Sequence, residues 1–212
     1  MTEMLHKALR QPQERAELYE LLRQAVLRCE RCGLCGTRRN VVVGEGSLTS
    51  RIMFVGEGPG EVEDETGRPF VGPAGQLLTR ILEAAGFKRE DVYITNIVKC
   101  RPPGNRVPQI EEVITCQNWL EAQLSLLRPK IIVTLGNTPL KWFLHVTGGI
   151  TKVRGRWFDW RGAALMPMFH PSYLLRNESR AQDSPKALTW RDIQQVYARY
   201  RGLMGGPDGT GE

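Results

Sequence analysis

Four short apolar runs separated by amphipathic segments constrain the fold of this 212-residue chain more than any other feature of its sequence. The runs predict buried strands, and the segments between them have the apolar spacing of helices. We expect strands at 51–55, 93–98, 130–135 and 163–169, with an edge strand or hairpin at 157–160. We expect helices at 13–28, 74–85, 109–127, 138–146 and 189–201. Strands alternating with such helices predict an α/β fold of three layers, α-β-α, with a central four-stranded, mostly parallel sheet.

The length and composition suit one globular domain with a full core, because 41% of the residues are hydrophobic. No repeat or long linker divides the chain, so we expect a single domain over 1–204 and a disordered tail over 205–212. The first ten residues lack the apolar region of a signal peptide, and no run of about 18 apolar residues occurs. We therefore expect an intracellular, cytoplasmic and nucleoid-associated protein that does not contact membranes.

A glycine-rich segment follows the first predicted strand, where open α/β sheets bind ligands. It contains Gly56, Gly58 and Gly60, and a tight strand-to-helix turn is the simpler explanation for them. The segment lacks the Gly-Lys-Ser/Thr of a phosphate-binding loop and the G-x-G-x-x-G pattern. Its acidic side chains would repel a phosphate, so we expect the loop to contact a base or a water molecule.

The other predicted strands end at Asn96, Gly136 and His170. Carboxyl ends of parallel strands share one edge of a sheet, so these residues and the glycine loop should lie together. The net charge is +6 despite the acidic loop. This segregation of charge favours a basic surface around a less basic pocket, as in a nucleic-acid-binding protein, although a mild positive excess is also common in other proteins.

The five cysteines indicate a metal site rather than disulfides. Cys29, Cys32 and Cys35 have C-x2-C-x2-C spacing, and Cys100 and Cys116 come later. Clustered thiolates with two remote partners are typical of an iron–sulfur or other metal site built from separated segments. Structural zinc also takes four thiolates, and scattered buried cysteines are the alternative without a metal.

The segment His170–Asn177 reads His-Pro-Ser-Tyr-Leu-Leu-Arg-Asn. A histidine at the end of a strand is often only a core side chain. Here two adjacent leucines follow it within a polar stretch, where they are poorly placed for a core. We predict that they form an apolar wedge of the kind that proteins insert between stacked bases when they extrude a nucleotide.

Together these motifs resemble the uracil-DNA glycosylases of family 4, the iron–sulfur-containing branch. The resemblance covers residues 25 to 200 and rests on Gly56–Glu61, Thr66–Gly72, Thr95–Pro103, His170–Asn177 and the cysteines. It implies a four-stranded parallel sheet between helices. It also implies hydrolytic excision of uracil, the product of cytosine deamination, from single- and double-stranded DNA, which leaves an abasic site. No lysine occurs in a motif that would support a Schiff base, so strand cleavage by lyase chemistry is not expected.

The resemblance also assigns roles to residues. It implies that Phe70 stacks on uracil, that Asn96 reads the pyrimidine edge and that His170 stabilises charge on O2. The backbone of Gly56, Glu57 and Gly58 would contact the base or the attacking water, and Glu63 would position that water or exclude a thymine methyl group. Gly58 stands where better-known uracil glycosylases have an aspartate, which leaves the group that holds the water open. The catalytic candidates are therefore Glu57, Glu63, Asn96 and His170.

For DNA binding, the resemblance implies that Leu174 is the wedge and that Ser172 and Arg176 lie near phosphates. Further basic candidates that flank the site are Lys152, Arg154, Arg156 and Arg180. It also implies a 4Fe–4S cluster as cofactor, with Cys29, Cys32, Cys100 and Cys116 as ligands. The spacing alone leaves open that Cys32 and Cys35 form the first pair instead. We expect a monomer that acts on uracil-containing DNA, with a replication clamp or repair proteins as further partners.

Two other functions fit the same motifs. One is a related uracil-binding protein that traps DNA covalently, but that branch carries a basic segment with a histidine after the second strand, and 100–108 is short and has no histidine. The other is a non-catalytic iron–sulfur protein that binds nucleotides.

Overall fold

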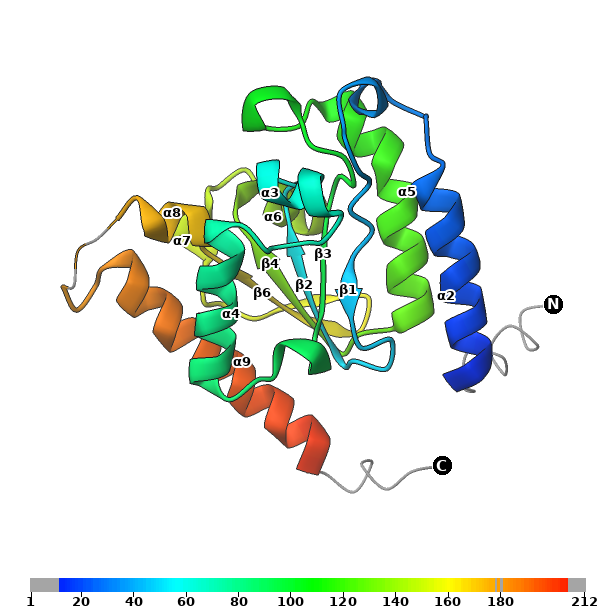
Figure 1. The fold of residues 1–212 in the computed structure, drawn as a ribbon. Helices are drawn as coiled ribbons and strands as arrows, with labels where there is room; N and C mark the ends of the chain where they lie inside the picture. Colours follow the sequence, from blue (N-terminus) through cyan, green and yellow to red (C-terminus); the bar gives the residue numbers. More distant parts are fainter. Residues whose placement is uncertain (1–11, 178, 180, 206–212) are drawn as a thin grey trace.

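A six-stranded mixed sheet forms the centre of the computed structural model, which describes residues 12–177, 179 and 181–205. The strand order is β1-β3-β2-β4-β6-β5, with the inner four strands parallel and the two edge strands antiparallel (Figure 1). The strands are β1 Glu45–Gly46, β2 Ile52–Gly56, β3 Tyr93–Asn96, β4 Ile131–Leu135, β5 Phe158–Trp160 and β6 Ala163–Met168. The predicted parallel core is confirmed, but the sheet has two additional edge strands. One of them, β1, was not predicted.

Helices cover both faces of this sheet, which confirms the predicted three layers. The long helices are α2 Pro12–Leu27, α4 Pro73–Ala85, α5 Ile110–Leu127, α6 Asn137–Leu144 and α9 Pro185–Gly205. Figure 1 shows α2 and α5 side by side on one flank, and α4 and α9 on the other. The described chain also has short helices that the sequence did not predict: α3 Glu61–Thr66, α7 Ile150–Val153 and α8 Pro171–Leu175. The disordered tail was predicted over 205–212; Gly205 is instead the last residue of α9, and 206–212 lie outside the described residues.

The alternation of side chains along the strands divides the core in two. On β2, Met53 and Val55 face the cluster beneath α2 and α5, whereas Ile52 and Phe54 face the cluster beneath α4 and α9. All four side chains are fully buried. A parallel strand covered on both faces is mostly apolar at every position, and this explains why β2 is a continuous apolar run and β4 is apolar except for Thr134.

The acidic segment after β2 forms helix α3 rather than the loop that we predicted. Its first turn contains Glu61, Glu63 and Asp64, which complement the positive end of the helix dipole. Gly67 then ends the helix in a left-handed conformation, with φ of 71°. The helix lies at the carboxyl edge of the sheet (Figure 1). No helix of the described residues is long and apolar enough to cross a membrane.

Candidate active site and thiol pocket

Strand register brings the first two candidate residues together. Gly56 pairs with Asn96 at the carboxyl ends of the adjacent parallel strands β2 and β3. Asn96 is only 1% exposed, and its Oδ1 atom has no hydrogen-bond partner. A Cβ atom added at Gly56 would lie 2.4 Å from this oxygen and 2.5 Å from Cζ of Phe70. The glycine is therefore required because an amide and an aromatic ring both approach its backbone closely.

The ring of Phe70 is held by a strained and well-supported turn. Phe70 has φ of 52°, a left-handed conformation that non-glycine residues rarely adopt. The Glu63 carboxylate supports the turn, because its Oε1 accepts the backbone N–H groups of Val71 (2.8 Å) and Gly72 (2.7 Å). On the other side, a Cβ atom at Gly75 would lie 1.9 Å from the Phe70 carbonyl carbon. Glu63 thus positions Phe70.

His170 follows β6 and lies beside this ring, with the Phe70 and His170 ring centroids 5.6 Å apart. Its Nδ1 atom accepts the backbone N–H of Ser172 at 3.1 Å and lies 2.8 Å from the Ser172 hydroxyl. Burial, followed by the charge of Arg176, lowers the pKa of His170 from 6.5 to about 4. The imidazole is therefore neutral near pH 7. Because Nδ1 is an acceptor, the ring carries its proton on Nε2.

The glycine loop places Glu57 and Gly58 at the same edge of the sheet. The Glu57 carboxylate accepts a hydrogen bond from the hydroxyl of Thr138, on α6. A Cβ atom at Gly58 would lie 2.8 Å from Cγ2 of Val98, so the loop packs tightly on the segment after β3. Thr138 is a residue that the sequence analysis missed, because it lies far from Glu57 in the chain and outside every motif.

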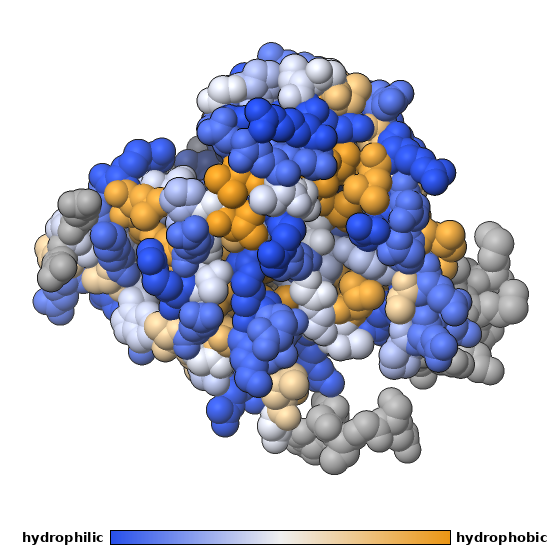
Figure 2. Space-filling view, in the orientation of Figure 1, coloured by the Kyte–Doolittle hydropathy of each residue, from blue (hydrophilic) through white to orange (hydrophobic). Residues whose placement is uncertain are grey.

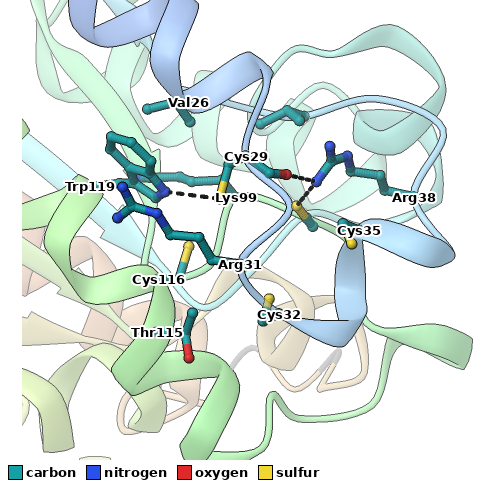
Figure 3. A pocket seen from close by; sticks show the side chains of 12 residues that line it. Val26, Cys29, Arg31, Cys32, Cys35, Arg38, Lys99, Thr115, Cys116 and Trp119 are labelled. Carbon is teal, nitrogen blue, oxygen red and sulfur yellow. Dashed lines mark hydrogen bonds between the residues drawn. The ribbon is translucent and has the colours of Figure 1, made fainter.

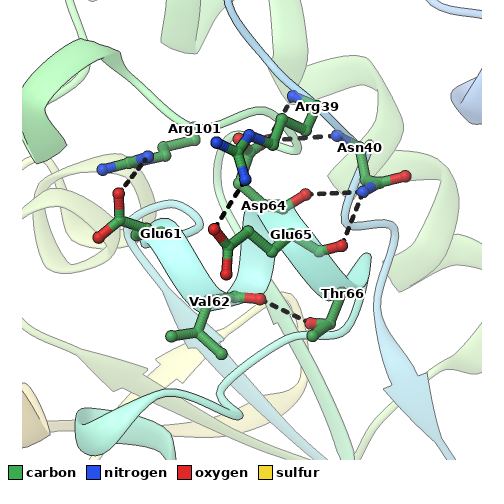
Figure 4. Close-up of polar contacts among 8 residues, drawn as sticks. All are labelled: Arg39, Asn40, Glu61, Val62, Asp64, Glu65, Thr66 and Arg101. Atoms are coloured by element: carbon green, nitrogen blue, oxygen red, sulfur yellow. Dashed lines mark hydrogen bonds and ion pairs between the residues drawn. The ribbon is translucent and has the colours of Figure 1, made fainter.

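Helix α3 is bonded to Arg39 and Asn40, in the segment that follows the first three cysteines (Figure 4). Asp64 is 2% exposed, and its Oδ1 accepts the backbone N–H groups of Arg39 (2.9 Å) and Asn40 (3.3 Å). The Asn40 amide donates to the backbone carbonyls of Asp64 and Glu65, and Arg39 forms an ion pair with Glu65 at 2.7 Å. The acidic residues of this helix therefore have a structural role in holding two loops together.

The wedge prediction for Leu174 is wrong in this structure. Leu174 is 1% exposed and packs in a cluster with Leu140, Ile150 and Phe169. Its neighbours on the short helix α8 point outward instead, since Tyr173 is 36% exposed and Leu175 is 40% exposed. In Figure 2, the surface over α8 shows a hydrophobic patch among hydrophilic residues.

One predicted phosphate contact is also wrong. Arg154 forms an ion pair with the fully buried Asp192 of α9 and donates to the Leu188 carbonyl. Its guanidinium group therefore already binds partners inside the protein and does not face a phosphate. Lys152, Arg156 and Arg176 are exposed, as binding to phosphates requires. Arg180 lies outside the described residues.

A second pocket is lined by all five cysteines, which come from three separate segments (Figure 3). Cys29, Cys32 and Cys35 follow α2, Cys100 follows β3 and Cys116 lies on α5. Trp119 Nε1 donates to Cys29 Sγ at 3.2 Å, and Arg38 donates to Cys100 Sγ at 3.3 Å.

Burial raises the pKa values of Cys32 and Cys116, and it raises the pKa of Cys100 to about 11. Negative charge on Cys32 and Cys29 also contributes to the raised pKa of Cys116. Among the described residues, no three His, Cys, Asp or Glu side chains converge in the way that a single metal ion requires.

The most unusual residue of this region is Lys99, which the sequence analysis did not single out. It is 1% exposed and lines the thiol pocket. Its ammonium group donates to Thr95 Oγ1 (2.6 Å), to the Asn96 carbonyl (2.7 Å) and to Gln123 Oε1 (2.7 Å). Burial lowers the pKa of Lys99 to about 7, opposed by negative charge on Cys116 and Cys100. Nothing in the sequence distinguishes this lysine from an exposed one.

The fold and these residues define a class of protein: an α/β domain in which a glycine loop, a buried amide, an aromatic ring and a histidine meet at the carboxyl edge of a parallel sheet, in a chain that also has a thiol-lined pocket. Residues 43–194 match the family model described as the uracil DNA glycosylase superfamily.

Three similar proteins are named type-4 uracil-DNA glycosylases. That of Thermotoga maritima is 56% identical over 167 residues, which cover 78% of this chain and 87% of the relative. That of Sulfurisphaera tokodaii is 45% identical, over 74% of this chain and 76% of the relative. That of Pyrobaculum aerophilum is 41% identical, over 81% of this chain and 90% of the relative. The chain therefore belongs to the type-4 branch of the uracil-DNA glycosylase superfamily, as the motifs predicted.

Proposed function

We propose that this protein hydrolyses the N-glycosidic bond of uracil in DNA, releases free uracil and leaves an abasic site. The observation that carries the proposal is the buried amide oxygen of Asn96, which has no partner and lies beside Phe70. A buried acceptor without a partner costs about 1–3 kcal/mol, and such groups in native proteins call for an explanation. A ligand that donates a hydrogen bond at this position supplies one.

The N3–H group of uracil is that donor. With its C=O toward N3–H, the Asn96 amide can direct its NH2 group toward O4 of the base. Cytosine presents the opposite pattern, with a bare N3 and an amino group, so both contacts would be mismatched. A site that relies on such hydrogen bonds rejects the wrong ligand by about 10⁴-fold or more. Phe70, fixed by Glu63, provides the face on which the base stacks.

His170 is the proposed electrophilic group. As the glycosidic bond breaks, negative charge develops on the departing uracil, and a donor placed at O2 stabilises it. The neutral imidazole with its proton on Nε2 is suited to donate to O2, because Ser172 occupies Nδ1. Glu57 is the carboxylate proposed to lie near the attacking water, with Thr138 fixing its orientation.

The proposed substrate is DNA with the uracil extruded from the stack. Tyr173 and Leu175 are the exposed apolar side chains closest in sequence to His170, so Leu175 replaces Leu174 as the proposed wedge. Ser172 and Arg176 on the same short segment are proposed to contact phosphates, together with Lys152 and Arg156.

We further propose that the thiol pocket holds a 4Fe–4S cluster through Cys29, Cys32, Cys100 and Cys116. The donor set supports this, because each ligand of such a cluster binds a different iron and the thiols need not converge on one point, whereas zinc requires four thiolates about 2.3 Å from a single ion. When bound, the cluster would supply metal–thiolate bonds that fasten α2 to α5.

One assay tests the reaction. A uracil-containing single strand is incubated with the protein and then treated with alkali. We expect free uracil with repeated turnover and alkali-dependent strand breaks. A covalent protein–DNA adduct would support the trapping function instead, and no reaction would support a binding protein.

Iron analysis of anaerobically purified protein tests the cofactor. We expect about four irons per chain, with loss of colour in Cys100→Ala. Stoichiometric zinc without iron would refute this assignment.

A further inference from the structure

Lys99 lies between the thiol pocket and the base-reading residue. Cys100 follows Lys99 directly in the sequence, and Asn96 precedes it by three residues. Lys99 lines the thiol pocket together with Cys100 and Cys116, while its ammonium group donates to the Asn96 carbonyl. A single residue therefore connects the pocket of the proposed metal ligands to the residue that is proposed to read uracil.

Each N–H group of the Lys99 ammonium has a hydrogen-bond acceptor, but none of the three acceptors is charged. Its three N–H groups donate to a hydroxyl, a backbone carbonyl and a side-chain amide. Gln123 is held in turn by its own bonds to the Val43 carbonyl (2.8 Å) and the Tyr93 hydroxyl (2.9 Å). Burying a cation costs several kcal/mol unless an anion lies close by. The thiols that line the same pocket are the groups able to provide that negative charge.

We propose that Lys99 is a positioning residue that links the thiol pocket to uracil recognition. Negative charge in the filled pocket holds the ammonium in place, and the ammonium fixes the Asn96 backbone so that its amide faces the base. This inference rests on the proposed function, because it assumes that Asn96 reads uracil and that the cysteines hold an anionic cluster.

A double-mutant cycle on the holoenzyme tests the link. Single-turnover excision is measured for Lys99→Met, for Asn96→Ala and for the double variant. If Lys99 acts through Asn96, Lys99→Met lowers the rate about tenfold or more in the wild-type background and less than about twofold in the Asn96→Ala background. Equal losses in both backgrounds overturn the proposal.

The second measurement is the rate of iron release to a chelator, which is monitored by visible absorbance in the absence of any substrate. We expect release from Lys99→Met to be several-fold faster than from wild type, and an unchanged release rate also overturns the proposal. Lys130→Met, in which the lysine is exposed, is the matched control and should behave as wild type in both measurements.

If Lys99→Met does not fold, Thr95→Val is the alternative variant, because it removes one acceptor of the ammonium group. Thr95→Val should slow excision and speed iron release by smaller factors, and it should not slow excision further in the Asn96→Ala background. Equal losses of excision rate in both backgrounds overturn the proposal. Failure of the proposed function is distinguishable from failure of this inference: the unaltered protein would then release no uracil, or Asn96→Ala would excise uracil as fast as the unaltered protein.

Discussion

The replacement of Gly56 by alanine is the sharpest test of the proposed base site. The new methyl group would lie 2.4 Å from Asn96 Oδ1 and 2.5 Å from Phe70 Cζ, so both groups have to shift by about 1 Å to restore ordinary van der Waals contact. A displacement of 1 Å at a reacting centre can cost about 10²-fold in rate. Gly56 does not have a positive φ. The backbone therefore tolerates alanine, and the loss arises from the contacts alone.

We expect Gly56→Ala to excise uracil about 10²-fold more slowly and to lose about 1–3 kcal/mol of stability through overpacking. The assay is single-turnover excision from an end-labelled oligonucleotide, combined with thermal unfolding. Gly202→Ala on α9 is the matched control, because its methyl group would meet nothing within 4 Å. Excision by a folded Gly56→Ala protein within about threefold of wild type would refute the reasoning, because a 1 Å displacement should cost far more.

Four further predictions concern residues of the same site. Asn96→Asp should lose most uracil excision and gain weak activity on cytosine, whereas Asn96→Ala should lose the first without the second, as release of both bases measures. Nitrogen NMR should show His170 neutral, with its proton on Nε2, at pH 5.5. Because the pKa of His170 is about 4 in the folded protein and 6.5 when unfolded, the unfolded state binds more protons between these values, and the contribution of His170 to stability should fall as pH falls through this window. Leu175→Ala should slow excision from duplexes more than from single strands, while equal losses would assign Leu175 to the fold. Arg176→Gln should weaken binding to all DNA sequences and reduce the salt slope by about one unit, as affinity titrations at several salt concentrations measure.

The parallel core could be predicted from sequence because each of its strands lies in a short, mostly apolar run that is bounded by segments of helical spacing. The edges could not. Val41, Val42 and Val43 form an apolar run, yet the edge strand β1 is the glycine-containing segment Glu45–Gly46 that follows them. The three valines are buried without forming a strand, and Val42 instead donates its backbone N–H to the Lys99 carbonyl at 2.8 Å. Apolar residues occur wherever a segment is buried, so composition does not distinguish a paired strand from a buried segment that forms no strand.

The candidate site shows the same division. Asn96, Phe70 and His170 could be placed together because strand ends and motifs identify them. The burial of Leu174 and the exposure of Leu175 could not be predicted, because a helix of about one turn is too short to show a periodic apolar pattern. Burial of Leu174 depends on partners such as Leu140, which is distant in sequence. The ion pair of Arg154 with Asp192 likewise joins residues that no local pattern relates.

The pairing of Gly56 with Asn96 also determines when in folding the pocket can exist. Parallel neighbours cannot be joined by a tight turn, so the whole segment 57–92, which contributes Phe70, lies between them. A slip of one residue would turn the Asn96 side chain to the opposite face of the sheet. A state with helices but without the correct register therefore has no site for the base. Free uracil should then bind only the native protein and stabilise it by about 2.7 kcal/mol at a concentration 100 times its dissociation constant. The number of uracil molecules bound per chain at saturation therefore measures what fraction of a refolded sample has its central strands correctly paired.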